Sequence, residues 1–333
     1  MIHRVVVIGA GRAGSQRAAA VAADGASRLV AVCDVDEKAA RRLAGEHGTR
    51  AHGDWRTLAA ADGVDLVVVS TPHHLLAEIS VAALEAGRHV LCEKPLGRNA
   101  AEVEEVAAAA RENGRVLRAG YNHRFHPAVE GVRRAAGEGS LGPLMFVRGR
   151  YGHGGRPGYD REWRSDAAAS GGGELLDQGA HLVDLFLWIL GCDFEAVSAE
   201  AVTAFWDMPV EDNAFALLRT TAGQIASMHV SWTQWKNLFS LEVFGRDGYA
   251  VAEGLGGSYG EERLVLGRRA PEGGAPQERL RRFPGPDRSW AREWKAFVDA
   301  VEGRPAAGAD GEAALRTMRH LGRLYAAARE QAP

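Results

Sequence analysis

Residues 4–14 read RVVVIGAGRAG, a short apolar run that ends in a glycine-rich turn. Gly9, Gly11 and Gly14 fit the pattern GxGxxG, and the alanine-rich residues that follow predict a helix. In a strand–turn–helix unit of this kind, the glycines let the backbone approach a pyrophosphate, and the helix N-terminus faces the phosphates. The stretch therefore predicts a dinucleotide-binding turn at the start of a Rossmann domain.

The next apolar run, 28–34, ends in an acid. Asp34 follows Gly14 by 34 − 14 = 20 residues, where a carboxylate accepts hydrogen bonds from the ribose hydroxyls of the adenosine. A carboxylate there repels the 2′-phosphate of NADP, so the sequence favours NAD. Arg12 and Lys38 are cations that could offset this repulsion, which keeps NADP as the alternative.

The first 120 residues alternate apolar strands with helices. Strands are predicted at 4–8, 28–34, 49–52, 65–70, 89–93 and 115–120, and helices at 12–24, 36–47, 75–86 and 99–113. Continuous apolar strands separated by helices indicate a parallel sheet that is covered on both faces. We therefore expect an α/β, doubly wound dinucleotide-binding domain over residues 1–120.

The pattern changes in the remaining residues, 121–333. Helices are predicted at 126–137, 174–191, 289–303 and 310–330, with several strands between 195 and 268, a loop at 151–173, and a loop or frayed edge at 271–286. Consecutive strands joined by turn signals indicate a mainly antiparallel sheet. We expect an α+β domain that binds the substrate and forms the oligomer.

Composition excludes several classes of protein. The 333 residues carry a formal charge of −3 without a long run of one sign, which argues against nucleic-acid binding and against contact with a membrane surface. No run approaches the ~20 apolar residues of a membrane span, and the N-terminus lacks the features of a signal peptide. Cys33, Cys92 and Cys192 are predicted to be buried free thiols, and a cytoplasmic protein is expected.

The strand at 89–93 ends in Glu93-Lys94-Pro95. Ligands of open doubly wound sheets bind outside the carboxyl ends of the strands, so this tripeptide is expected at the same edge as the glycine turn. Pro95 biases Lys94 towards extended conformations, and a cis Lys94–Pro95 bond is one option. A merely solvated charge at a strand end is the alternative to a catalytic lysine.

Three ionisable residues follow in a second motif. Asp177, His181 and Asp184 are spaced by four and three residues, which places them on one face of the predicted apolar helix. Histidine is the natural base for the proton of an alcohol, and an aspartate can orient its imidazole. A helix-start acid with a satisfied core histidine is the alternative. A metal site is less favoured, because no Cys or second His lies nearby in the sequence.

The motifs GAGRAG, STP, EAGRHVLCEKPL, GYNHRF, GGGELLDQGAHLVD and WILG occur in this order over residues 4–191. In this respect the chain resembles the family of glucose–fructose oxidoreductase, inositol dehydrogenase and rhizopine-catabolism proteins (Gfo/Idh/MocA). The resemblance implies a Rossmann domain followed by a domain with a large, mostly antiparallel open sheet. It also implies an NAD(P)-dependent oxidoreductase that transfers a hydride between nicotinamide and a secondary alcohol or ketone of a sugar, sugar derivative or cyclitol.

Residue roles are carried over from the family by position. The catalytic lysine of its EKP motif falls on Lys94, and the aspartate and histidine of its DxGxH motif fall on Asp177 and His181. The family's TPNxxH motif is altered, with His73 for its Asn and Leu76 for its His. Residues expected to bind the cofactor are Gly9, Gly11, Arg12, Ala13, Gly14, Asp34, Thr71, Pro72, His73, Glu93 and Lys94. Residues expected to bind the substrate are Lys94, Arg124, Trp163, Arg164, Asp177, His181 and Trp235.

The family sheet often packs face to face in dimers and tetramers, so a homodimer or homotetramer is expected. Apolar residues expected on the outward face are Phe215, Leu217, Trp232 and Phe244. Two other functions remain open: a glycosidase that uses NAD for transient oxidation, and a non-catalytic ligand sensor on the same fold. The presence of both Lys94 and His181 speaks against the sensor.

Overall fold

The computed structural model describes residues 2–331, which form two compact units. The first unit contains the chain up to Asn122 and two later segments, 168–171 and 288–318. The second contains 123–167, 172–287 and the residues from Arg319 onward. Compactness does not say which residues bind which ligand, so the expected division into functional domains at residue 120 stays a prediction. The contacts do place segment 288–318 with the first unit.

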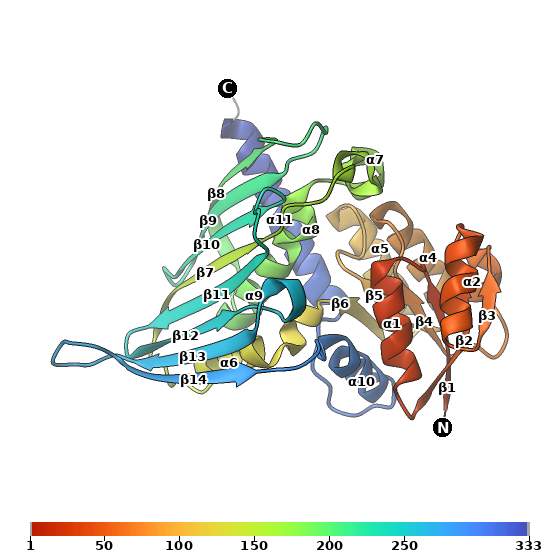
Figure 1. Cartoon of the computed structure of the whole chain (residues 1–333), viewed down its shortest axis with the longest axis horizontal. Helices are drawn as coiled ribbons and strands as arrows, with labels where there is room; N and C mark the ends of the chain where they lie inside the picture. The colour runs from red at the N-terminus through yellow and green to blue at the C-terminus, as the bar shows by residue number, and fades with distance from the viewer. Residues whose placement is uncertain (1, 332–333) are drawn as a thin grey trace. The chain divides into compact units, whose positions relative to one another are not determined.

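A six-stranded parallel sheet forms the centre of the first unit (Figure 1). Its order is β3-β2-β1-β4-β5-β6, which confirms the predicted doubly wound topology. The strand order reverses between β1 and β4, which is the switch point of the sheet. The strands are β1 His3–Ile8, β2 Ser27–Cys33, β3 Arg50–His52, β4 Leu66–Val69, β5 His89–Glu93 and β6 Leu117–Gly120. The helices between them are α1 Arg12–Ala22, α2 Glu37–Glu46, α3 Trp55–Ala59, α4 His73–Glu85 and α5 Ala100–Glu112.

The helices of this sheet begin in different ways. Asp36 caps α2 by accepting from Lys38 N, and Asn99 caps α5 by accepting from Glu102 N. No side chain caps α1, which starts directly after the glycine turn. The N–H groups of its first turn therefore face the carboxyl edge of the sheet without a local side-chain acceptor.

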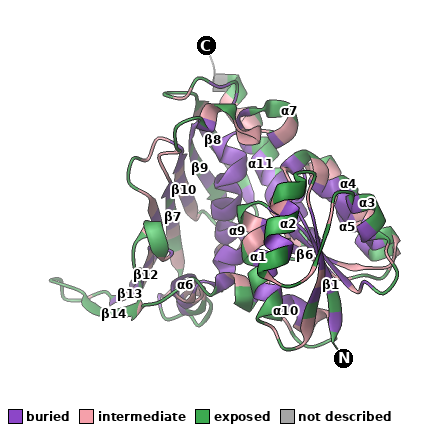
Figure 2. Ribbon diagram, turned by 45° about the vertical axis from the view of Figure 1, so that its right-hand side comes forward, coloured by how far each residue is buried: buried purple, intermediate pink, exposed green. Residues whose placement is uncertain are grey.

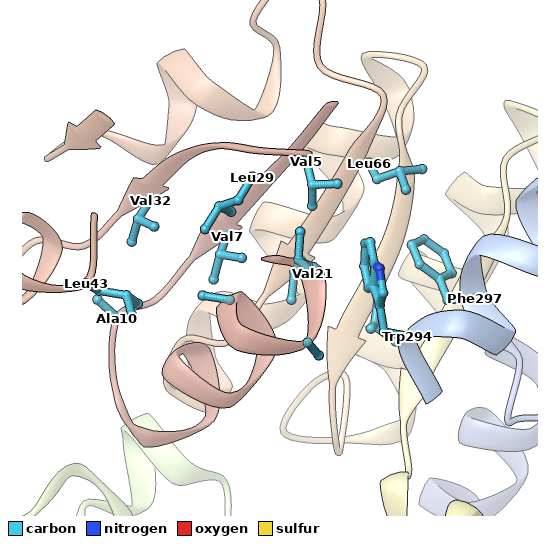
Figure 3. Packing of buried hydrophobic residues seen from close by; sticks show 14 of the residues in the cluster. Val5, Val7, Ala10, Val21, Leu29, Val32, Leu43, Leu66, Trp294 and Phe297 are labelled. Carbon is cyan, nitrogen blue, oxygen red and sulfur yellow. The ribbon is translucent and has the colours of Figure 1, made fainter. Parts of the chain in front are cut away.

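The core of the first unit is completed by a helix from the end of the chain (Figure 3). Helix α10 (Ser289–Val301) places Trp294 and Phe297 against Val5 and Leu66, and both rings are almost fully buried. The Trp294 Nε1 donates to Ser27 Oγ at 3.1 Å. The sheet therefore depends on a segment almost three hundred residues away in the sequence.

The second unit is built on an eight-stranded sheet of order β14-β13-β12-β11-β7-β10-β9-β8. Only β7 and β10 pair in parallel, so the sheet is mostly antiparallel, as predicted. Its strands are β7 Leu144–Gly152, β8 Phe194–Val202, β9 Asn213–Thr220, β10 Ile225–Ser231, β11 Leu238–Gly245, β12 Gly248–Glu253, β13 Glu262–Arg268 and β14 Gln277–Phe283. Helices α6 Pro127–Gly137, α8 Glu174–Asp177 and α9 Gly179–Leu190 pack against one face. Helix α11 (Gly311–Gln331) ends the described chain.

Three predicted elements differ from the structure. The predicted helix over 174–191 is interrupted at Gln178, because the His181 N–H bonds Gln178 O only three residues back, and Gly179 packs against Leu175. The start of the predicted 151–173 loop belongs to the missed strand β7. The predicted loop or frayed edge contains β14, an edge strand that is exposed almost throughout (green in Figure 2).

The outward face of the larger sheet was predicted correctly except at one residue. Phe215 and Leu217 are 47% and 53% exposed, and Phe244 is half-buried. Trp232, however, is fully buried. It follows the last residue of β10, and its N–H bonds Asp212 O at 2.7 Å, which turns the ring into a cluster with Tyr159 and Trp206.

Two further observations concern the chain as a whole. Cys33 and Cys92 are buried free thiols, as predicted, and burial raises the pKa of Cys92 to about 12; Cys192 is only partly buried. Among residues 2–331, the structure contains no helix with the length and hydropathy needed to cross a membrane.

The position of α10 leads to a stability prediction. Trp294→Ala should destabilise the protein by about 3–5 kcal/mol, because it leaves a cavity in the core of the parallel sheet and removes the bond to Ser27. Urea denaturation measures this change. Trp235→Ala is the matched control, since that ring is 66% exposed, and should change stability by about 0.5 kcal/mol or less. Equal midpoints for the two variants would contradict the assignment of α10 to the core.

Candidate active site

The turn between β1 and α1 brings three backbone segments into contact. Gly9 has φ +103°, a conformation that favours glycine, and a Cβ there would overlap the Ser70 carbonyl oxygen. A Cβ on Gly14 would overlap the carbonyl oxygen of Gly9. A Cβ on Gly11 would meet nothing within 4 Å. Packing therefore explains why positions 9 and 14 are glycine. At position 11 the missing side chain leaves open space beside the start of α1.

The groups around this turn fit a dinucleotide. Ser70 Oγ and Thr71 Oγ1, just after β4, are buried without a hydrogen-bond partner within residues 2–331. The uncapped first turn of α1 adds N–H donors and the positive end of a helix dipole. Pyrophosphate and ribose oxygens are suitable partners for both sets of groups. Pro72 then occupies the N-cap position of α4.

Asp34, directly after β2, is held against the glycine turn. Its Oδ2 accepts from Ala10 N at 2.6 Å, and its Oδ1 accepts from Asp36 N at 2.9 Å. Each carboxylate oxygen keeps a second lone pair. The side chain is therefore fixed beside the turn and can still accept from a ribose hydroxyl.

His73 begins α4 and is buried. Its Nδ1 lies 2.7 Å from Ser170 O. Since a carbonyl oxygen only accepts, Nδ1 carries the hydrogen of this bond. The residue that departs from the family motif thus anchors segment 168–171 within the first unit.

The EKP tripeptide forms a tight turn after β5. The Lys94–Pro95 peptide bond is cis, Leu96 has φ +72°, and Leu96 N donates to Glu93 O at 3.1 Å. Within residues 90–97, Lys94 alone is not fully buried. The lysine therefore emerges from a buried turn at the carboxyl edge of the sheet.

In the second unit, His181 at the start of α9 stacks on His123. The ring centroids are 3.8 Å apart with an interplanar angle of 29°, and both side chains are buried. Tyr151 contacts both rings, tilted to His123 and edge-on to His181, and Phe239 contacts His123 edge-on. His181 is thus held at a fixed orientation by an aromatic cluster from β7, β11 and the segment before α6.

The tyrosines nearby do not serve as bases. Burial, followed by the hydrogen-bonded Tyr259 and the carboxylates Asp177 and Glu174, raises the pKa of Tyr151 well above its usual value. Burial also raises the pKa of Tyr159, and Asp177 adds to this effect. Both phenols remain protonated, so an imidazole is the better proton acceptor near neutral pH.

Asp177, at the end of α8, is paired with Arg164. Arg164 Nε donates to Asp177 Oδ2 at 3.2 Å, and the two side chains are 33% and 12% exposed. Burial is the largest effect and opposes the charge on Arg164, but Asp177, Tyr159 and Glu162 together outweigh it, so the pKa of the guanidinium is raised. The pair also approaches Tyr159, which makes one polar cluster of these three residues.

Asp184 belongs to a different interaction. Its carboxylate accepts from Arg124 Nε at 2.8 Å and from Arg124 Nη2 at 2.6 Å, and both side chains are buried. Burial raises the pKa of Asp184 despite this partner. The predicted single helix is wrong at Gln178, which separates Asp177 in α8 from His181 and Asp184 in α9.

Two predicted substrate residues are tryptophans. Trp163 is half-buried, with the Arg164 guanidinium 4.5 Å from its ring centre. Trp235 is 66% exposed and meets Phe205 edge-on at 4.8 Å. Both rings offer an exposed surface, which suits the apolar face of a polyhydroxylated ring.

The predicted site residues divide between the two units. The first unit holds Gly9, Gly11, Arg12, Ala13, Gly14, Asp34, Thr71, Pro72, His73, Glu93 and Lys94. The second holds Arg124, Trp163, Arg164, Asp177, His181 and Trp235. In the part of the chain that the structure describes, no group of three or more His, Cys, Asp or Glu side chains is arranged to hold a metal ion.

Two residues of these clusters and one buried arginine of α1 were not predicted from the sequence. His123 lies inside the quoted motif GYNHRF, and its stacking on His181 could not be read from spacing. Tyr151 lies on the missed strand β7. Arg17 is a lone charge on the buried face of an alanine-rich helix, and that unusual position was the signal for it.

Comparison with known proteins gives a consistent assignment. Residues 3–121 match the family model "Oxidoreductase family, NAD-binding Rossmann fold", and residues 129–251 match "GFO/IDH/MocA C-terminal domain". An inositol 2-dehydrogenase from Rhizobium meliloti is 30% identical over 95% of this chain and 94% of its own. A levoglucosan dehydrogenase from Pseudarthrobacter phenanthrenivorans is 33% identical, over 56% of this chain and 47% of its own.

A solved structure extends the similarity over the whole fold. GenD2 from gentamicin A biosynthesis, in complex with NAD, superposes with a TM-score of 0.87 at 29% identity, covering 99% of this chain and 95% of that chain. These matches confirm the family and the class of enzyme predicted from the motifs. The chain belongs to the Gfo/Idh/MocA family of NAD(P)-dependent oxidoreductases.

Proposed function

We propose that the protein transfers a hydride between NAD and a secondary alcohol or ketone of a sugar, sugar derivative or cyclitol. The observation that carries this proposal is Lys94, the one partly exposed residue of a buried turn at the sheet edge that also carries the glycine turn. The relatives are named as dehydrogenases of inositol and levoglucosan, which supports the substrate class. The names of these relatives do not favour the two alternative functions, a glycosidase that uses NAD for transient oxidation and a non-catalytic ligand sensor.

The chain's own residues would move the proton and hold the reacting oxygen. NAD, when bound, supplies the hydride acceptor. His181 Nε2 or Nδ1 takes the proton of the substrate hydroxyl, and the stacked His123 keeps the ring in place. Lys94 donates to the same oxygen and stabilises its developing negative charge. Asp177, held by Arg164, orients the imidazole or a neighbouring hydroxyl.

The substrate would be bound by the remaining polar and aromatic groups of the second unit. Arg164, Trp163 and Trp235 provide a guanidinium and two accessible rings. Arg124 is less suited to direct contact, because its Nε and Nη2 already donate to Asp184. Its role in substrate binding stays a prediction.

Asp34 supports NAD over NADP as the cofactor. Its carboxylate is fixed beside the turn by two backbone N–H groups, so it cannot easily move away from a 2′-phosphate. Val35, the next residue, is 83% exposed and gives that phosphate no cation.

We also propose a homodimer or homotetramer in the cytoplasm. Phe215 and Leu217 expose apolar area on the sheet face that carries no helix, and a second copy of this face would cover them.

The catalytic proposal predicts unequal effects on rate and cofactor binding. A screen of sugars and inositols by NADH absorbance first identifies a substrate. Lys94→Ala and His181→Ala should each lower kcat by about 10²–10⁴-fold, because each removes a group that acts on the reacting oxygen. The Kd for NADH, measured by fluorescence, should change much less, and the double variant should lose much less than the product of the two effects. A near-normal kcat for Lys94→Ala would leave the lysine as a solvated charge.

Asp34 gives a test of cofactor choice. The protein should bind NADH more tightly than NADPH, and Asp34→Asn should narrow this preference by about tenfold, or about 1.4 kcal/mol. The amide removes the charge and keeps an oxygen that can accept from Ala10 N. Titration with both cofactors measures the ratio, and tighter binding of NADPH by the wild type contradicts the proposal.

The assembly is tested by light scattering. The wild type should be larger than the 35.6 kDa monomer, and Leu217→Glu should dissociate it by placing a charge in the covered face. Ile2→Glu, at an equally exposed site in the first unit, is the control and should leave the assembly intact. A wild-type monomer at assay concentrations would exclude this interface.

A further inference from the structure

Arg17 is a fully buried arginine on α1, one turn beyond the glycine turn. Its Nε donates to Glu93 Oε1 at 2.7 Å, and its Nη2 lies 2.5 Å from the same oxygen. Its Nη1 donates to Glu293 Oε2 at 2.5 Å. The ring of Trp290 lies 4.5 Å from the guanidinium carbon. All four residues belong to the first unit.

This cluster joins three elements that are distant in the sequence: α1, the end of β5 and α10. It is also tightly packed, since a Cβ on Gly120 would lie 2.6 Å from Arg17 Nη2 and 3.1 Å from Glu93 Oε1. Burial opposes the charge of Arg17, but Glu293 and Glu93 outweigh it, and the pKa of the guanidinium is raised. Arg17 therefore stays charged, and its planar fork holds both carboxylates in place.

The position of Glu93 links the Arg17 cluster to Lys94. Glu93 is the last residue of β5 and directly precedes Lys94. Lys94 is the first residue of the turn that Leu96 N closes on Glu93 O, so a fixed Glu93 fixes where that turn begins. Without Arg17, the Glu93 carboxylate would be a buried anion without its cation, in the residue that directly precedes Lys94. Such a carboxylate pairs with the nearest cation.

We propose that Arg17 is a positioning residue for Lys94: it holds Glu93 and so fixes the turn that presents the lysine. Glu293 of α10 is the second anchor of the same guanidinium. The inference rests on the proposed function for its kinetic consequence. The same helix that begins at the dinucleotide turn thus also sets the geometry of the EKP turn.

The test must separate the positioning of Lys94 from the loss of stability that follows when buried carboxylates lose their cation. Arg17→Met alone leaves two buried carboxylates and can fail to fold. The triple variant Arg17→Met/Glu93→Gln/Glu293→Gln removes all three charges with little change of volume. We expect it to fold and to bind NADH within about threefold of the wild type, while kcat falls by about 10- to 100-fold, as a small misplacement of a reacting group produces. A kcat within twofold of the wild type overturns the proposal.

Two further variants complete the comparison. Arg17→Lys keeps the charge but loses the planar fork, so kcat should fall between the wild type and the triple variant; an unchanged kcat overturns the proposal even if the triple variant does not fold. Arg111→Met is the matched control, because Arg111 also bridges two carboxylates, Glu104 and Glu312, but is exposed. Its kcat should equal that of the wild type.

A readout that does not depend on activity separates this inference from the proposed function. The chain contains four lysines, at positions 38, 94, 236 and 295. Isotope labelling of the lysine side chains therefore gives four NMR signals, and Lys94→Arg identifies the one from Lys94. Arg17→Lys adds a fifth signal from the new side chain; among the four original signals, that of Lys94 should shift or broaden while the other three stay in place. An unmoved Lys94 signal overturns the inference. If the signal moves but the wild type oxidises no polyol, the proposed function fails and the positioning role stands.

Discussion

The close contact of three backbone segments at the glycine turn is the constraint on which the first unit depends. Gly9 and Gly14 lack side chains because the backbone of β4's end and of the turn itself occupies that space. This contact fixes the start of α1 relative to β1 and β4, at the point where the strand order reverses. Asp34 then ties β2 to the same turn through Ala10 N. The ligand-binding edge is therefore rigid before any ligand is present.

Each unit also contains one buried arginine that neutralises a carboxylate next to a proposed catalytic residue. Arg17 holds Glu93, the neighbour of Lys94, and Arg124 holds Asp184, one turn from His181. In both pairs the guanidinium is buried, so separating the acid from its arginine would cost much free energy. Lys94 and His181 are thus close in sequence to acids that already bind an arginine, Glu93 and Asp184.

The sequence predicted the elements that depend on local pattern. The glycine turn, the strands of the parallel sheet and the exposed Phe215 and Leu217 follow from glycine spacing and apolar periodicity. The interruption at Gln178 could not be predicted, because the apolar run through it has a continuous helical period and the break comes from packing around Gly179. The contacts of Glu293 and Trp294 with the first sheet are also non-local, and no spacing rule reveals them.

The break at Gln178 has a chemical consequence for the two aspartates around His181. Asp184 is 1% exposed and bound by a guanidinium through two hydrogen bonds, so a substrate cannot compete for it. Asp177 lies at the end of α8, before the break, and meets Arg164, whose side chain is one-third exposed and makes a longer bond of 3.2 Å. Because a more exposed and longer ion pair is weaker, the Arg164–Asp177 pair is weaker than the buried Arg124–Asp184 pair. The aspartate of the DxGxH motif is thus the less firmly paired of the two acids, while Asp184 is fixed by Arg124 within the buried part of the helix.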